Sequence, residues 1–84
     1  MTDVRIEIGS YSGYRGEESP RVFFAHGKKI TVTCILRMWV AEEESGRRRR
    51  RFFRVEGGDG FTHTLYYDEE TQEWFCREFE RNAT

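Results

Sequence analysis

Hydrophobic and polar residues alternate along much of this chain, which is the pattern of half-buried β-strands. The alternation is clearest near the start, where Val4, Ile6 and Ile8 are separated by Arg5 and Glu7. Further segments of strand character cover residues 20–25, 30–36, 51–55, 61–67 and 74–80. No segment shows the spacing of an amphipathic helix. We therefore expect an all-β protein with about five to six short antiparallel strands.

The strand at residues 30–36 has the strongest signal, because β-branched residues dominate it. The alternation assigns its side chains to two faces, one with Ile30, Val32, Cys34 and Leu36 and the other with Thr31, Thr33 and Ile35. Cys34 and Cys76 both lie in apolar strands, so we expect each to be a small buried hydrophobe. Phe53 and Trp74 are predicted core residues, and Trp39 is left open.

Glycine, serine and other turn residues separate these strands. Residues 9–19 are rich in Gly, Ser and Tyr and predict a loop. A tight turn is expected at residues 26–28, where Gly27 can adopt the positive φ that a hairpin turn requires. With 84 residues the chain forms a single small domain, residues 1–84. Short strands with regular turns predict a meander that curls into a small, partly open barrel.

The charges are concentrated in one segment, residues 42–51, which reads EEESGRRRRR. Its arginines are five of the chain's 14 basic residues, whereas the whole chain has 15 acidic residues and a net charge of −1. A basic patch on an otherwise acidic protein is therefore predicted, and net charge alone does not reveal it.

A hairpin with its tip at Ser45 and Gly46 would pair these opposite charges. The pairs would be Glu44 with Arg47, Glu43 with Arg48 and Glu42 with Arg49, each contributing about 0.2–1 kcal/mol. Three acids balance at most three arginines, so positive charge remains for an anionic partner. Arginine binds phosphate or carboxylate through two parallel hydrogen bonds. The candidate nucleic-acid or anion site is Arg47, Arg48, Arg49, Arg50 and Arg51.

Two functions follow from these features. In the first, a non-enzymatic binding module uses the arginine arm to hold nucleic acid or an acidic protein surface. In the alternative, the arm is a self-paired hairpin and the protein is an interaction or self-assembly domain with Tyr11, Tyr14 and Trp39 at its surface. The sequence leaves the partner and the oligomeric state open.

Catalytic and metal-binding chemistry has weak support. His26, Cys34, His63 and Cys76 are of the residue types that bind zinc, but none lies in a close-spaced pair. A small enzyme or metal protein built on these residues is the third hypothesis and ranks below the others. We expect no catalytic residues, no metal and no cofactor.

Apolar segments, the first residues and the cysteines together predict where in the cell the protein is found. It has no apolar run near the 18 or so residues that a membrane span needs, and its first residues do not resemble a secretory signal. Two cysteines make a poor disulfide framework. We therefore expect a cytoplasmic protein without a membrane partner.

Dispersed apolar and turn positions between residues 20 and 80 also carry a family resemblance. The shared positions are Pro20 to Phe23, Gly27-Lys28, Val32 to Leu36, Trp39, Phe52 to Val55, Asp59-Gly60, Leu65 to Asp68 and Trp74. In these the chain resembles a family of small uncharacterised bacterial proteins with an SH3-like barrel. The resemblance implies that fold, but it assigns no functional residues. Residues 1–19 and 42–51 lie outside it.

Overall fold

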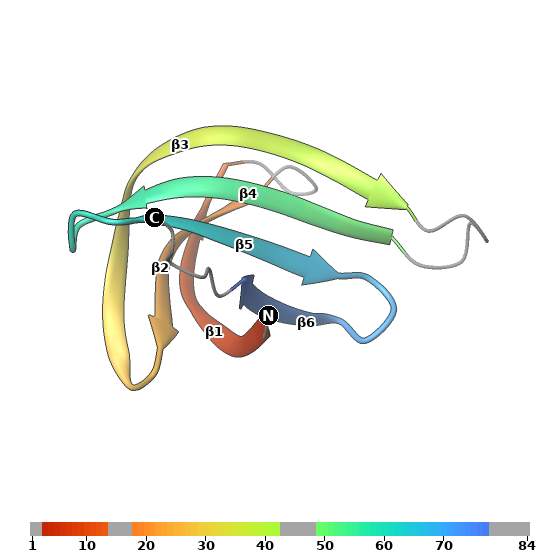
Figure 1. Ribbon diagram of the computed structural model, residues 1–84, viewed down its shortest axis with the longest axis horizontal. Helices are drawn as coiled ribbons and strands as arrows, with labels where there is room; N and C mark the ends of the chain where they lie inside the picture. Colours follow the sequence, from red (N-terminus) through yellow and green to blue (C-terminus); the bar gives the residue numbers. More distant parts are fainter. Residues whose placement is uncertain (1–2, 14–17, 43–48, 78–84) are drawn as a thin grey trace, which may run out of the picture.

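Six antiparallel β-strands form the protein (Figure 1). The computed structural model describes residues 3–13, 18–42 and 49–77. The strands are β1 (Asp3–Ser12), β2 (Ser19–Ala25), β3 (Lys28–Glu42), β4 (Arg49–Gly57), β5 (Thr62–Asp68) and β6 (Glu73–Arg77). The described residues contain no helix with the length and apolarity to cross a membrane.

Each strand pairs with the next one along the chain, and β1 also pairs with β6, so the sheet closes into a barrel. The predicted all-β fold with a small antiparallel barrel is confirmed. The barrel is closed, whereas a partly open one was expected, because two bent strands each pair with two neighbouring strands. Asp3 to Ile6 of β1 pair with β6, and Glu7 to Ser12 pair with β2. In β3, Lys28 to Thr31 pair with β2, and Val32 to Glu42 pair with β4.

The turn between β2 and β3 forms as expected. Ala25 pairs with Lys28, and the two residues between them have positive φ, 53° at His26 and 75° at Gly27. Positive φ at both central positions is the geometry of a type I′ hairpin turn, whose twist matches that of the flanking strands. The predicted role of Gly27 is therefore confirmed.

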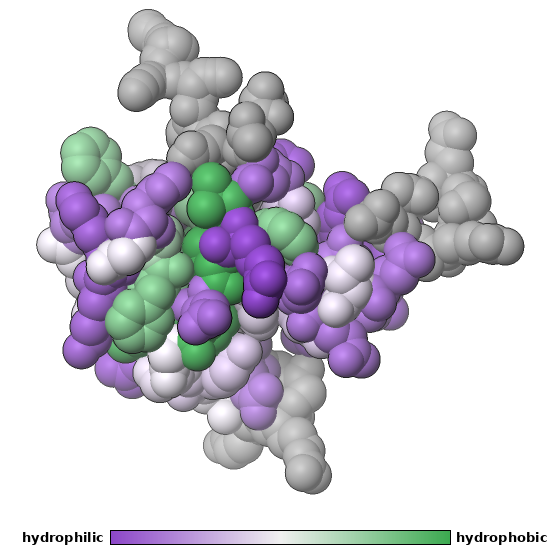
Figure 2. Space-filling view, turned by 90° about the horizontal axis from the view of Figure 1, so that it is seen from below, coloured by the Kyte–Doolittle hydropathy of each residue, from purple (hydrophilic) through white to green (hydrophobic). Residues whose placement is uncertain are grey.

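The core lies inside the barrel and draws on β1 to β5. Its buried hydrophobic residues are Ile6, Phe23, Ala25, Ile30, Phe53, Val55 and Leu65. Trp74 and Cys76 of β6 pack against this cluster from partly buried positions. The core prediction is thus confirmed for Phe53 and confirmed in part for Trp74, which is partly buried. In Figure 2, hydrophobic side chains gather near the centre of one face, with hydrophilic ones around and partly over them.

The predicted faces of β3 are wrong beyond Val32. Irregularities in the pairing with β4 fall between Val32 and Cys34 and between Ile35 and Arg37. Each β-bulge inserts a residue and reverses the direction of the side chains that follow it. Ile35 consequently packs against the core, whereas Cys34 is exposed and Leu36 is 50% exposed. The expectation of a buried Cys34 is therefore also wrong.

The loop predicted at residues 9–19 is shorter than expected. β1 continues through Ser12 and β2 begins at Ser19, with register shifts between Ile8 and Tyr11. Glycine suits this stretch, because a Cβ at Gly9 would lie 2.9 Å from Cε1 of Phe24 on the neighbouring strand. Tyr14 lies outside the described residues.

Candidate nucleic-acid interface

A row of aromatic side chains crosses the outer face of strands β3 to β6. In the strand register, Trp39 lies opposite Phe52, Phe52 opposite Tyr66 and Tyr66 opposite Phe75. Successive ring centroids are 5.1, 5.0 and 5.2 Å apart. These distances are close to the spacing of strands in a sheet, about 4.8 Å. We call these four residues the aromatic ladder.

A basic row lies beside the aromatic ladder, two residues away from it on each strand. Arg37 of β3 lies opposite Arg54 of β4, Arg54 opposite Thr64 of β5, and Thr64 opposite Arg77 of β6. Arg37, Arg54 and Arg77 are exposed. Like charges directly opposite one another destabilise a sheet. The pairing of Arg37 with Arg54 therefore costs stability in the absence of an anion.

Arginine side chains also lie over the ladder. The guanidinium carbons are 4.9–5.4 Å from the ring centroids in the pairs Arg37–Trp39, Arg77–Phe52 and Arg50–Tyr66. Such cation–π contacts contribute about 0.5–1 kcal/mol each at exposed sites. Although they lie on the outer face, Phe52 is only 4% exposed and Tyr66 5%. The ladder is thus a support that holds guanidinium groups at the surface.

Acidic residues also lie on this face. Asp3 is opposite Arg77 in the register, and Glu56 follows Arg54 by two residues on β4. Asp68, opposite Arg50 in the register, places Oδ2 3.9 Å from the Nε of Arg50. Glu73 lies 3.7 Å from the Nε of Arg5 on β1. Within residues 3–13, 18–42 and 49–77, no ion pair involves the arginines of the basic row.

A hydrogen bond ties the ladder to β1. The Tyr66 hydroxyl donates to the carboxylate of Asp3, across the end of the barrel sheet. Burial of the hydroxyl, together with this carboxylate, raises the pKa of Tyr66 to about 12. The hydroxyl therefore stays protonated through the neutral range and keeps donating to Asp3.

The arginine run is partly self-paired, as one reading of the sequence predicts. Glu42 lies opposite Arg49, and its Oε2 is 3.8 Å from the Nε of Arg49. Arg50 faces outward beside Asp68 and Tyr66. Arg51 faces the opposite way and lines a recess at one mouth of the barrel. Arg47 and Arg48, with the pairings predicted for them, lie outside the described residues.

The predicted interaction residues do not form one surface. Tyr11 packs on Trp74 at the mouth of the barrel, with ring centroids 6.1 Å apart and the indole Nε1–H donating to the Tyr11 hydroxyl at 3.1 Å. Tyr67 and Phe53 contact the same tryptophan. Trp39 instead begins the aromatic ladder on the outer face. The two residues thus belong to separate aromatic groups.

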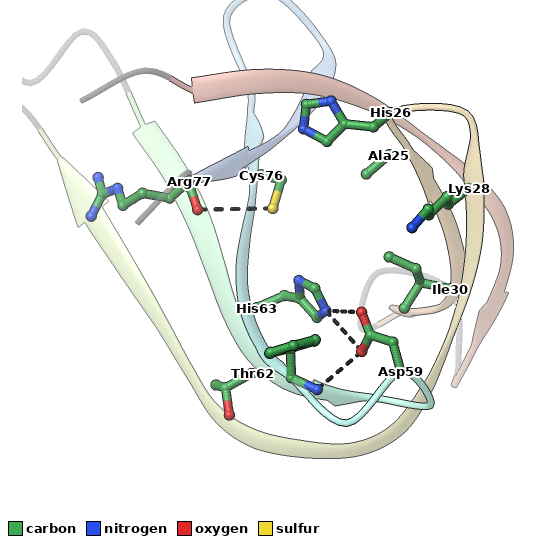
Figure 3. A pocket seen from close by; sticks show the side chains of 10 residues that line it. Ala25, His26, Lys28, Ile30, Asp59, Thr62, His63, Cys76 and Arg77 are labelled. Carbon is green, nitrogen blue, oxygen red and sulfur yellow. Dashed lines mark hydrogen bonds and ion pairs between the residues drawn. The ribbon is translucent and has the colours of Figure 1, made fainter. Parts of the chain in front are cut away.

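A cavity of about 700 Å³ occupies the mouth near the β2–β3 turn (Figure 3). Asp59 and His63 lie on one side of it, with the His63 Nε2 3.0 Å from Oδ2 and 3.2 Å from Oδ1 of Asp59. Burial acts to raise the pKa of Asp59, but the hydrogen bond from the Phe61 N–H and the contact with His63 outweigh it and lower that pKa. The polar groups of the cavity include the Asp59 carboxylate, but this carboxylate already contacts the Phe61 N–H and His63.

Three of the four residues considered for zinc line this cavity, namely His26, His63 and Cys76. Cys34 lies elsewhere, beside a different recess on β3. Among the described residues, no group of three or more His, Cys, Asp and Glu side chains is arranged to hold a metal ion. The cavity therefore has no metal-binding geometry in the described part of the chain.

The sequence reasoning missed the basic row and most of the aromatic ladder. Strand alternation alone places Phe52 and Arg54 on the face opposite Phe53, so a signal for their orientation was present. It does not place Arg37 opposite Arg54, because that pairing depends on the bulge between Ile35 and Arg37. The row appears only when the cross-strand register is known.

Comparison with known proteins adds no functional assignment, since no family model, curated protein or solved structure matches this chain. The resemblance to small bacterial proteins with an SH3-like barrel therefore remains a prediction. The function has to be argued from the residues of the barrel itself.

Proposed function

We propose that this protein is a non-enzymatic cytoplasmic module that binds single-stranded nucleic acid across the outer face of β3 to β6. The observation that carries the proposal is the basic row, Arg37, Arg54 and Arg77, lying alongside the aromatic ladder. A positive surface that follows the phosphates, combined with planar groups that contact bases, is the usual design of proteins that bind single strands.

The guanidinium groups are arranged to contact phosphate. Arg37 and Arg77 rest on the rings of Trp39 and Phe52, so their planes are already ordered before a ligand arrives. Ordering a long side chain in advance reduces the entropy lost on binding. A phosphate between Arg37 and Arg54 would also relieve the repulsion between these opposed charges.

The planar groups on this face favour a single strand over a duplex. Phe52 and Tyr66 are buried, so the surfaces offered to bases are the guanidinium planes and the partly exposed rings of Trp39 and Phe75. Unstacked bases stack on aromatic side chains and on arginine planes. Bases in a duplex are already stacked on one another, so only its backbone would be available to these groups.

The arginine run has a secondary part in this proposal. Glu42 and Asp68 neutralise part of the charge of Arg49 and Arg50. Arg50 nevertheless lies on the same outer face as the basic row and adds to its potential. The self-paired arm and the nucleic-acid surface are thus compatible, because the Glu42–Arg49 pair engages none of the basic-row arginines.

The test is a fluorescence-anisotropy titration of labelled oligo(dT) at several salt concentrations. A triple variant carries Arg37→Gln, Arg54→Gln and Arg77→Gln. Its matched control carries Arg21→Gln, Lys28→Gln and Lys29→Gln, which remove the same charge from exposed positions on β2 and β3. Each phosphate contact with a single strand contributes about −0.7 to the slope of log K against log salt concentration, so three contacts give a slope of about −2.

We expect wild type and control to bind with this slope and the basic-row variant to lose both affinity and slope. Arg54→Gln alone is a milder probe, and we expect it to reduce the slope by about 0.7. Equal loss in the two triple variants would mean that net charge alone drives binding, and the proposed site would be wrong. If wild type binds no oligonucleotide at low salt, the nucleic-acid function itself is wrong.

Two observations favour the self-assembly function. The Glu42–Arg49 pair is what a self-paired arm requires, and the part of β3 before Glu42 exposes the apolar side chains of Leu36, Met38 and Val40. If no oligonucleotide binds, this second function becomes the better account of the protein.

A further inference from the structure

The long strand β3 has one edge without a partner along most of its length. Only Lys28 to Thr31 pair with β2, while Val32 to Glu42 pair with β4 alone in the ladders of residues 3–13, 18–42 and 49–77. Figure 1 shows this part of β3 at the margin of the molecule with β4 on its inner side. A strand edge of this kind presents N–H and C=O groups that another strand can pair with.

The side chains of this edge are apolar and exposed. Leu36 is 50%, Met38 62% and Val40 49% exposed. Proteins usually protect a free edge with lysine, proline or a bulge. From Arg37 to Glu42 the register with β4 is regular, and Arg37 is the only charged residue before Glu42. The two bulges of β3 lie before Arg37, so the part of the edge from Arg37 to Glu42 lacks most of the features that prevent pairing with another chain.

We propose that β3 pairs with β3 of a second copy of this chain, antiparallel about a two-fold axis at Met38. Residues opposite each other in an antiparallel pair lie on the same face. Leu36 would then face Val40 of the second copy, and the two Met38 side chains would meet at the axis. Met38 of each copy is thus covered by Met38 of the other, and Val40 is covered by Leu36, the residue at the bulge.

The charged and aromatic residues on the other face also suit this register. Arg37 would lie opposite Trp39 of the second copy, which repeats across the interface the contact that Arg37 makes with Trp39 within the chain. No pair of like charges lies directly opposite between Leu36 and Val40. Trp39 ends the aromatic ladder at this edge, so the pairing places Arg37 of the second copy next in line after its ring. These features favour a second copy over an unrelated strand.

Sedimentation velocity over a range of concentrations tests the dimer in protein freed of nucleic acid. We expect the mass to rise with concentration from 10.1 kDa to twice that value. Met38→Lys should keep the protein monomeric, because it buries an unpaired charge at the axis. Phe61→Lys is the matched control, since Phe61 is 67% exposed and lies in the β4–β5 connection. The control should dimerise like wild type.

Cross-linking tests the register. Directly opposed residues in an antiparallel pair have Cα atoms about 4.5–5.5 Å apart, within the range that a disulfide spans. In a Cys34→Ser background, Met38→Cys should form a disulfide dimer under mild oxidation, and Phe61→Cys should not. A wild type that stays monomeric at all concentrations would overturn the inference, as would equal cross-linking at both positions or open-ended assembly.

This result is separable from the nucleic-acid proposal. Met38→Lys leaves the basic row intact but adds one positive charge beside Trp39. Loss of oligonucleotide binding when the three basic-row substitutions are added to this monomeric variant would therefore report on the outer face. The basic-row variant retains Leu36, Met38 and Val40, so its sedimentation reports on the β3 edge even when oligonucleotide binding is lost.

Discussion

The hydrogen bond between Tyr66 and Asp3 makes a sharp prediction about stability in alkali. The phenol has an ordinary pKa of 10.0, and in the folded protein burial and the Asp3 carboxylate raise its pKa to about 12. Because the folded pKa exceeds the unfolded one, the protonated phenol stabilises the fold fully below pH 10. That contribution is lost as the pH rises from 10 to about 12.

The size of the effect follows from the same values. The rise in pKa from 10.0 to about 12 corresponds to at most about 2.7 kcal/mol. We expect about 1–2 kcal/mol, since the hydrogen bond lies at the protein surface beside the exposed Asp3 and water screens it. Tyr66→Phe removes the titrating group and should cost about 1 kcal/mol at neutral pH through loss of a hydrogen bond.

Urea unfolding at a series of pH values between 8 and 12 measures this directly. Other tyrosines and lysines also titrate in this range, so the informative quantity is the free energy of unfolding of wild type minus that of Tyr66→Phe. We expect this difference to shrink above pH 10, whereas Tyr67→Phe should follow wild type. If wild type and Tyr66→Phe lose stability in parallel up to pH 12, the reasoning about this hydrogen bond is wrong.

Two further substitutions test the turns that shape the barrel. Asp68 is 2% exposed, accepts the Glu70 N–H at 3.0 Å and pairs with Arg50, so Asp68→Ala should lower the free energy of unfolding by about 2–3 kcal/mol in urea titrations. An unchanged midpoint would contradict that account. A Cβ at Gly57 would lie 2.6 Å from Oδ1 of Asp59 and 2.9 Å from Cγ2 of Ile30, so Gly57→Ala should cost about 1–3 kcal/mol. Gly58→Ala, whose nearest neighbour would be 3.6 Å away, is the matched control, and equal costs at both positions would refute the steric argument.

The sequence was informative wherever alternation and turn chemistry act locally. The strands, the hairpin turn at Gly27 and the burial of Phe53 all follow from residues close together in the chain. The pairing of Glu42 with Arg49 also follows, because a hairpin with a short tip has few registers available.

The side-chain directions in β3, the basic row and the aromatic ladder depended on how strands far apart in the sequence are aligned. Two irregularities in β3 turn Ile35 inward and Cys34 outward, and no local propensity of the residues involved predicts them. The same shifts bring Arg37 opposite Arg54. The aromatic ladder requires four strands to be aligned at once, so it cannot be inferred from any single segment.

The central claim is that the outer face of β3 to β6 is the nucleic-acid surface, and mapping by NMR tests it most directly. Titration of labelled protein with unlabelled oligo(dT) would follow the indole N–H of Trp39 and the backbone amides of the basic row. We predict that these signals shift together while those of Lys28 and Lys29 stay in place. Shifts confined to the cavity beside Asp59, or no shifts at all at low salt, would contradict the claim.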